Sequence, residues 1–203
     1  MTNLELAYPF NGRWLVQNSP ANRVPSHGTE LFGTSYAIDF VPVDAHGRTA
    51  PFRLASMIRT EAPTRFPGFG RPILAPISGL VVAVHDGEPD HDAYRGLPSI
   101  GYALTQGRRA ADGWLGLAGN HVVIQVEAGP VVVLCHLRRD SITVSRGQPV
   151  TTGSVVAQCG NSGNSTEPHL HLQAMDRADI HSATATRISF LGGLPRNGEV
   201  VVA

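Results

Sequence analysis

Two histidines one residue apart are the most informative feature of the sequence. They lie in the stretch Glu167-Pro-His-Leu-His-Leu-Gln. Because alternate residues of a β-strand face the same way, His169 and His171 would project together while the leucines beside them face the core. Two adjacent imidazoles are a poor way to build a core, but they suit a divalent metal or the water that it binds. The stretch therefore predicts a metal or catalytic site.

Two further polar residues interrupt apolar runs. His136 alternates with apolar residues in Val131–Leu137. Alone it would indicate a half-buried structural histidine, but beside the His-x-His pair it becomes a candidate general base or transition-state donor. Asp39 interrupts the apolar run Tyr36–Val43. A buried carboxylate is costly unless it is paired or bound to metal, so this position favours a ligand.

These segments together resemble the M23 family of zinc metallopeptidases, the lysostaphin- or LytM-like enzymes. The resemblance spans roughly Ile73–Leu172, interrupted by a long insertion, together with the strand that bears Asp39. It is carried by Ile38-Asp-Phe, Gly119-Asn-His-Val-Val-Ile, Cys135-His-Leu, Val144-Ser-Arg-Gly-Gln-Pro-Val-Thr-Thr-Gly and Gly160-Asn-Ser-Gly-Asn-Ser-Thr-Glu-Pro-His-Leu-His.

The resemblance implies a cofactor, a substrate class and roles for the residues. The cofactor would be Zn²⁺, with Asp39 and His171 as ligands. His136 and His169 would be catalytic, polarising the attacking water and stabilising the tetrahedral intermediate. The substrates would be peptide bonds in bacterial cell-wall peptidoglycan or related peptides. The implied fold is mostly β, an antiparallel twisted sheet of the lysostaphin/LytM-like, duplicated hybrid-motif type with long loops.

One position departs from the family pattern. The family motif has its first zinc histidine four residues before the aspartate, where this chain has Ser35. A serine hydroxyl is a poor zinc ligand, and the nearest upstream histidine is His27, twelve residues before Asp39. Since Gly28 and Gly33 allow sharp turns, we expect His27 to complete the site. The alternatives are a surface role for His27 and a two-ligand or metal-free site.

Short β-rich runs broken by Gly, Pro and Asn dominate the chain, which indicates an antiparallel β domain. We expect one M23-like domain over residues 1–203. Residues 1–70 would supply N-terminal strands and loops, including Asp39, and residues 71–175 the core. The expected strands are Arg13–Gln17, Tyr36–Val43, Leu80–His85, His121–Val126, Val131–Leu137, Val155–Gln158 and His169–Ala174.

The segment Asp86–Gly119 is long for a connection between two strands. Long loops in compact domains are usually functional or disordered. We therefore expect this insertion to form a wall or lid over the site, with a short helix within Ile100–Trp114.

Composition excludes several classes of function. The 203 residues carry zero formal net charge, so nucleic acid is not an expected partner. All sixteen basic residues are arginine, which excludes a carrier domain that is acylated on lysine. No apolar run reaches the ~20 residues of a membrane span. The N-terminus lacks the basic start and apolar run of a secretion signal, although the family usually acts in the cell envelope or outside the cell. The cellular location therefore stays open.

Two points are left open by the sequence. Cys135 and Cys159 are either two buried thiols or one disulfide. The leading functional hypothesis is an active zinc endopeptidase, and the main alternative is a catalytically degenerate M23-like domain that acts as a binding or regulatory module. A sugar-binding β domain is a third interpretation, but such a domain should expose aromatic residues, and only 6% of residues are aromatic.

Overall fold

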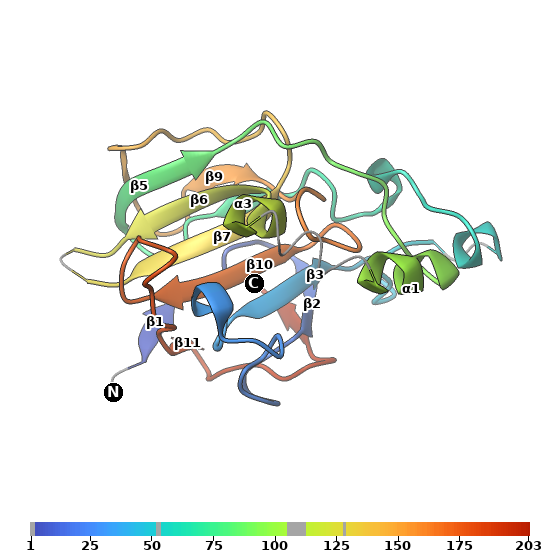
Figure 1. Ribbon diagram of the computed structural model, residues 1–203. Coiled ribbons are helices and arrows are strands. Elements are labelled where there is room, and N and C mark those ends of the chain that lie inside the picture. The colour runs from blue at the N-terminus through green and yellow to red at the C-terminus, as the bar shows by residue number, and fades with distance from the viewer. Residues whose placement is uncertain (1–2, 52–53, 105–112, 128) are drawn as a thin grey trace.

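An antiparallel β-sheet organises the backbone (Figure 1). The structure, a computed structural model, describes residues 3–51, 54–104, 113–127 and 129–203. Within these residues, eight strands form one sheet in the order β12-β2-β3-β10-β7-β6-β5-β8, with every neighbouring pair antiparallel. Their bounds are β2 Arg13–Gln17, β3 Ile38–Pro42, β5 Gly79–His85, β6 Asn120–Gln125, β7 Val131–Leu137, β8 Pro149–Val150, β10 Leu170–Met175 and β12 Val200–Val202.

Two small sheets complete the β structure. The strands β1 (Leu4–Leu6) and β11 (Ile188–Phe190) pair in parallel, and β4 (Pro72–Leu74) pairs antiparallel with β9 (Val155–Gln158). The predicted fold class, mostly β with an antiparallel sheet, is therefore confirmed.

The central strands are buried on both faces, which explains their nearly continuous apolar runs. Every residue of β7 and of β10 is buried. One face of the sheet packs on the main core, where an aromatic cluster lies. Phe10 stacks on Trp14 at a centroid distance of 4.5 Å, and Tyr8 stacks on Phe190 at 4.6 Å. Rings of this size bury large apolar areas, so this cluster stabilises the packing of that face of the sheet on the main core.

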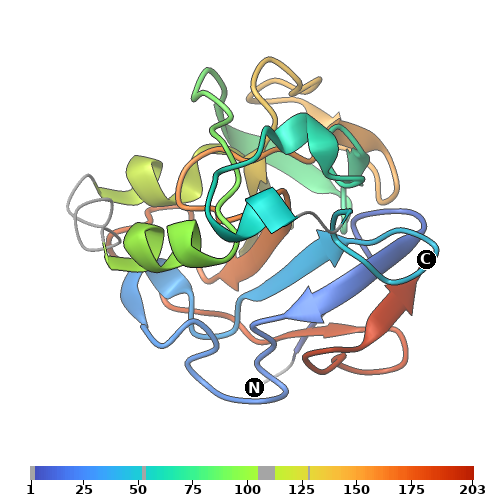
Figure 2. The ribbon, with the colours of Figure 1, turned by 90° about the vertical axis from the view of Figure 1, so that its right-hand side faces the viewer.

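The opposite face carries the short helices. Figures 1 and 2 show α3 (Gly113–Ala118) and the 3₁₀ turn η1 (Leu31–Gly33) on this face, with α1 (Leu97–Leu104) on the same side. Two more 3₁₀ turns are η2 (Leu54–Met57) and η3 (Pro63–Arg65). Among the described residues, no helix has the length and apolar character needed to cross a bilayer.

The seven predicted strands are all present, and each end lies within two residues of its expected position. The short strands β1, β4, β8, β11 and β12 lie outside the seven expected ranges. They have only two or three residues each, too few to show a period of two. The helix expected within Ile100–Trp114 is wrong in extent, because α1 begins before that range and α3 runs beyond it. Residues 105–112 lie outside the described residues.

The predicted division of the chain into regions stays a prediction. β2 and β12, from opposite ends of the chain, nevertheless pair with each other in the same sheet as the central strands. This pairing fixes the N-terminal region beside the strands of the expected core.

The end of α3 approaches the loop that leads into β10 closely. Gly119 has φ +60°, and a Cβ at this position would lie 2.6 Å from the carbonyl carbon of Ser162 and 2.7 Å from the nitrogen of Gly163. We expect Gly119→Ala to lower the free energy of unfolding by about 2–4 kcal/mol, from left-handed backbone strain and overlap with main-chain atoms. Urea unfolding monitored by circular dichroism measures this.

The matched control is Gly101→Ala in α1, where a Cβ meets nothing within 4 Å. An alanine inside a helix should leave stability unchanged or raise it by about 0.5–1 kcal/mol. Equal losses from the two variants would contradict the close approach at Gly119.

Candidate metal centre

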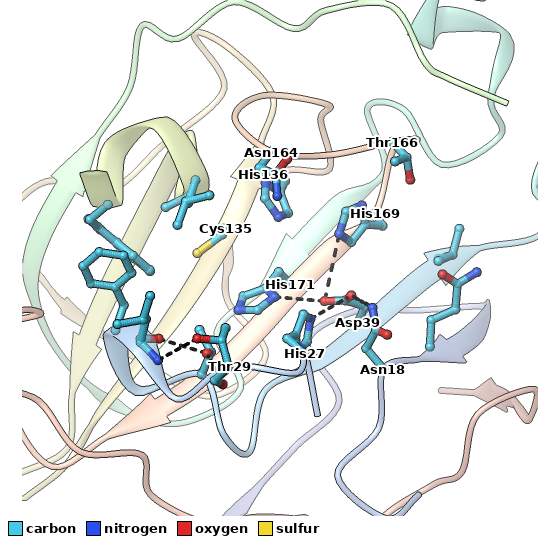
Figure 3. A pocket seen from close by; sticks show the side chains of 18 of the residues that line it. Asn18, His27, Thr29, Asp39, Cys135, His136, Asn164, Thr166, His169 and His171 are labelled. Atoms are coloured by element: carbon cyan, nitrogen blue, oxygen red, sulfur yellow. Dashed lines mark hydrogen bonds and ion pairs between the residues drawn. The ribbon is translucent and has the colours of Figure 1, made fainter. Parts of the chain in front are cut away.

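A groove opens on the face of the sheet that carries α3 and η1. Its volume is about 490 Å³. Figure 3 shows the imidazoles of four histidines and one carboxylate gathered on its floor. All five residues selected from the sequence line it, namely His27, Asp39, His136, His169 and His171. Their roles stay predictions, but the structure brings them together.

Asp39 and two histidines form the tightest cluster. β3 lies beside β10 with Asp39 directly opposite His171, and Nδ1 of His171 lies 2.9 Å from Oδ1 of Asp39. The loop before β3 returns His27 to the same carboxylate, with Nε2 3.0 Å from Oδ2. Ser35, at the family position, does not line the groove. The imidazole beside Asp39 is therefore that of His27, which lies further upstream in the sequence than the family position.

The donor set of this cluster fits a zinc ion. One ligand atom from each of the three residues lies within 4.8 Å of the other two. Ligands at about 2.0–2.2 Å from a tetrahedral zinc lie about 3.3–3.5 Å apart. The observed nitrogen–oxygen distances of 2.9 and 3.0 Å would have to widen by only a few tenths of an ångström. Two imidazoles and one carboxylate are also an ordinary ligand set for catalytic zinc.

His136 reaches the groove through a break in the strand pattern. The pairing of β6 with β7 shifts between Asn120 and Val122, so that β7 contains an extra residue there. His136 has φ +60°, a left-handed conformation that is uncommon for a residue other than glycine. Cys135 and His136 consequently both line the groove although they are consecutive. Regular alternation, on which the prediction rested, would have placed His136 with Leu134 in the main core.

The two remaining imidazoles turn one nitrogen toward the groove. His136 lies with Nδ1 2.9 Å from the carbonyl oxygen of Ser162, and His169 with Nδ1 2.8 Å from that of Glu167. Because a carbonyl only accepts, each Nδ1 carries the proton and each Nε2 keeps its lone pair. The two rings lie 4.6 Å apart, and Nε2 of His169 is 3.9 Å from Oδ1 of Asp39. Both are therefore arranged to accept a proton beside the carboxylate.

Burial and neighbouring charges set the ionisation of the site. Burial raises the pKa of Asp39, but attraction by His27 and hydrogen bonds from His171 and His27 outweigh it and hold the pKa well below its usual value. Burial, helped by repulsion from His169 and His171, holds the pKa of His136 well below its usual value. At neutral pH the site thus contains an ionised Asp39 and a neutral His136.

Both cysteines are free, buried thiols, so the disulfide alternative is wrong. Cys135 lines the groove, but burial and then repulsion by Asp39 raise its pKa. A thiol in this state is a weak nucleophile and a weak metal ligand. Cys135 therefore contributes shape to the groove floor.

Sequence reasoning missed several residues of the groove. Asn18, at φ +48° after β2, donates from Nδ2 to Oδ2 of Asp39 at 2.7 Å. Nothing in the sequence marks it, because an asparagine after a strand is an ordinary turn residue. Trp114 and Leu117 of α3 form one wall. This bears out the expectation that part of Asp86–Gly119 walls the site, for which the signals were its length and its position between two strands of the site.

The neutral state of His136 generates a prediction about acid stability. Its folded pKa lies below the unfolded value of about 6.5, so the unfolded chain binds more protons just below that pH. Stability should therefore be complete above pH ~6.5 and fall as the pH decreases, by up to about 1.4 kcal/mol per pH unit. Urea unfolding of chelator-treated protein between pH ~7.5 and ~5 measures this slope.

The control is His136→Asn, because asparagine does not titrate and tolerates a left-handed backbone. The slope should become shallower, whatever the absolute stability of the variant. Superimposable slopes for the two proteins would show that His136 is not held neutral by the fold.

Comparison with known proteins gives the chain a family. The model of peptidase family M23 matches residues 65–184, a range that contains His136, His169 and His171. The peptidoglycan DD-endopeptidase ShyA of Vibrio cholerae is 34% identical over 79 residues, which are 39% of this chain and 18% of that protein. The glycyl-glycine endopeptidase ALE-1 of Staphylococcus capitis is 27% identical over 89 residues, 44% of this chain and 25% of that protein.

The chain thus matches a quarter or less of the length of these relatives. Among solved structures, the catalytic domain of the prophage-encoded M23 protein EnpA of Enterococcus faecalis is 19% identical with a TM-score of 0.48, over 89% of this chain and 93% of that one. Because the family model matches more than half of its residues, the chain belongs to peptidase family M23.

Proposed function

We propose that the protein is a zinc-dependent endopeptidase that hydrolyses peptide bonds in bacterial cell-wall peptidoglycan. The observation that carries the proposal is the convergence of five side chains in one groove. Three of them offer ligand atoms within 4.8 Å of one another, and two others turn an Nε2 lone pair toward the same space. Membership of peptidase family M23 supports the same reaction class.

The zinc would be held by His27, Asp39 and His171. When bound, it supplies a Lewis acid for the peptide carbonyl and lowers the pKa of water to about 7. Asp39 offers the negative charge, and its low pKa keeps it ionised at neutral pH. One coordination position of a tetrahedral ion stays open with three protein ligands, as catalytic chemistry requires.

His136 and His169 would move the protons. Neutral His136 accepts a proton from the attacking water at Nε2, while its Nδ1–H stays on the carbonyl of Ser162. His169 has its Nε2 3.9 Å from Oδ1 of Asp39, a carboxylate that would stabilise the imidazolium formed when this nitrogen takes up a proton. It can therefore donate to the oxyanion of the tetrahedral intermediate. The centroids of the two rings lie 4.6 Å apart, so both imidazoles could contact the same scissile peptide bond, one on each side of it.

The substrate class comes from the relatives. ShyA is named a peptidoglycan DD-endopeptidase and ALE-1 a glycyl-glycine endopeptidase, so both are named for cleavage within peptides. The groove suits an extended peptide, since α3 supplies an apolar wall of Trp114 and Leu117. A peptidoglycan substrate also requires the protein to act in the cell envelope or outside the cell, which we propose as its location.

The division of roles predicts opposite results for two neighbouring histidines. His169→Ala should lower turnover of peptidoglycan-derived peptides by about 10²–10⁴-fold while zinc stays bound, because it removes a proton-handling group. His171→Ala should lose the zinc, because it removes a ligand. Zinc content by elemental analysis and cleavage by mass spectrometry, with and without a chelator, measure both effects.

Two outcomes would contradict this assignment. Zinc lost from His169→Ala, with activity kept in His171→Ala, would exchange the two roles. A wild-type protein that binds zinc but cleaves no peptide would favour the binding or regulatory module.

The position of His27 predicts that it replaces the missing family histidine. His27→Ala should weaken zinc binding by at least about tenfold, because two protein ligands hold a catalytic zinc poorly. Competition with a chromogenic chelator measures the affinity. The matched control is His46→Ala, which removes an exposed histidine outside the groove. Equal affinities of wild type and His27→Ala would sink the three-ligand site.

A further inference from the structure

Each histidine of the proposed zinc site contacts a buried polar side chain through the ring nitrogen that faces away from Asp39. Both of these side chains also hydrogen-bond to the turn that contains η1. We propose that Gln173 and Ser26 are positioning residues, which fix the ring nitrogen that His171 and His27 each present to the metal. Both positioning side chains donate hydrogen bonds to main-chain carbonyls within residues 32–35. This inference rests on the proposed function, because it concerns the same zinc site.

Gln173 determines the orientation of His171. It is fully buried, two residues after His171 on β10, and so faces the same side of the sheet. Its Nε2 donates to the carbonyl oxygen of Phe32 at 2.8 Å, and a carbonyl only accepts. Its Oε1 must therefore be the atom that faces Nε2 of His171 at 3.0 Å. In the zinc-loaded protein Nε2 would therefore carry the proton, and Nδ1, the atom beside Asp39, would be presented to the metal; without metal, Asp39 accepts a hydrogen bond from Nδ1.

Ser26 orients His27 in the same way, except that here Nδ1 contacts the positioning side chain and Nε2 faces Asp39. It is fully buried, and its hydroxyl donates to the carbonyl oxygen of Thr34 at 3.3 Å. Because a hydroxyl has one proton, Oγ is left to accept from Nδ1 of His27 at 3.0 Å. In the zinc-loaded protein the lone pair on Nε2 of His27, the atom 3.0 Å from Oδ2 of Asp39, would then be presented to the metal.

The turn that receives both bonds is itself fixed to β10. Phe32 and Gly33 have φ of +57° and +69°, and a Cβ on Gly33 would lie 2.8 Å from Cγ of Met175. The N–H of Ser26 also donates to the carbonyl of Ser35, at 3.0 Å. Ser35 occupies the position of the missing family histidine, so its main chain helps to hold the residue next to His27. The turn thus links the substitute ligand to the strand that carries His171.

The test is zinc affinity of Gln173→Met and Ser26→Ala, measured by chelator competition. Gln173→Met keeps the length of the side chain but cannot accept from Nε2–H, and Ser26→Ala removes the acceptor for Nδ1–H. Loss of such an outer partner lowers metal affinity by about 10–100-fold, so each variant should bind at least about tenfold more weakly. The matched controls are Gln158→Met and Ser154→Ala, which remove hydrogen-bonded side chains far from the groove.

A spectroscopic readout separates positioning from a general loss of structure. Long-range ¹H–¹⁵N NMR of the zinc-loaded wild type should show His171 protonated at Nε2 and His27 at Nδ1. Each variant should lose this preference at its own histidine while the other ring keeps it. Gln173→Glu is the conservative control, because its carboxylate still accepts from Nε2–H and should keep the tautomer of His171, and Ser26→Ala tests the inference independently if Gln173→Met does not fold.

The outcomes distinguish this inference from the proposed function. A loss of affinity smaller than about tenfold in either folded variant, or an equal loss in its control, would overturn the positioning role. The opposite tautomers in the wild type would also overturn it. If the wild type bound zinc but cleaved no peptide, the proposed function would fail, while the zinc affinities and ring tautomers of the variants would still decide whether Gln173 and Ser26 orient the imidazoles.

Discussion

The buried carboxylate of Asp39 is the constraint on which the site depends. Only 5% of this residue is exposed, and an ionised carboxylate at that depth is strongly destabilising unless partners surround it. Asn18 comes from the end of β2, His171 from β10 and His27 from the preceding loop. β3 must therefore lie between β2 and β10, as the strand order shows. The hydrogen-bond partners of this one carboxylate thus come from both strands that neighbour β3.

The four histidines around that charge fall into two groups, according to what the ring nitrogen that faces away from Asp39 contacts. His136 and His169 donate from Nδ1 to main-chain carbonyls in the 160–167 loop, and Nδ1 of His169 also lies 2.9 Å from the hydroxyl of buried Ser165. His27 and His171 contact the buried side chains of Ser26 and Gln173. In the proposed mechanism the first arrangement would leave Nε2 of each ring for proton transfer, and the second would present one nitrogen of each ring to the metal beside Asp39.

Much of this site was accessible from sequence because strand period and residue type carry local information. His169 and His171 share a face by alternation, and the same rule extends to Gln173, which the sequence analysis did not use. His27 followed from the chemistry of zinc, since Ser35 cannot replace an imidazole. His136 was selected by alternation and by its pairing with the His-x-His strand, but strict alternation gives the wrong face. The bulge depends on pairing with β6, and a pairing partner is not a property of a single strand.

The fold shows the same division between local and distant information. Strands of four or more residues were predicted because their apolar runs are readable, whereas those of two or three residues exist only through distant partners. β12, for example, is defined by its pairing with β2 at the other end of the chain. The helical wall of the groove was foreseen only as a long insertion, because the six residues of α3 are too few to show a helical period.

The pairing of β3 with β10 also bears on when the site comes into existence. Asp39 and His171 are 132 residues apart in sequence, and a shift of one residue between their strands would turn one of them to the other face. Contacts of such long range are made slowly and late in folding. A partly folded chain would therefore lack the proposed metal site. The proposed hydrolytic activity would then appear only with the complete sheet.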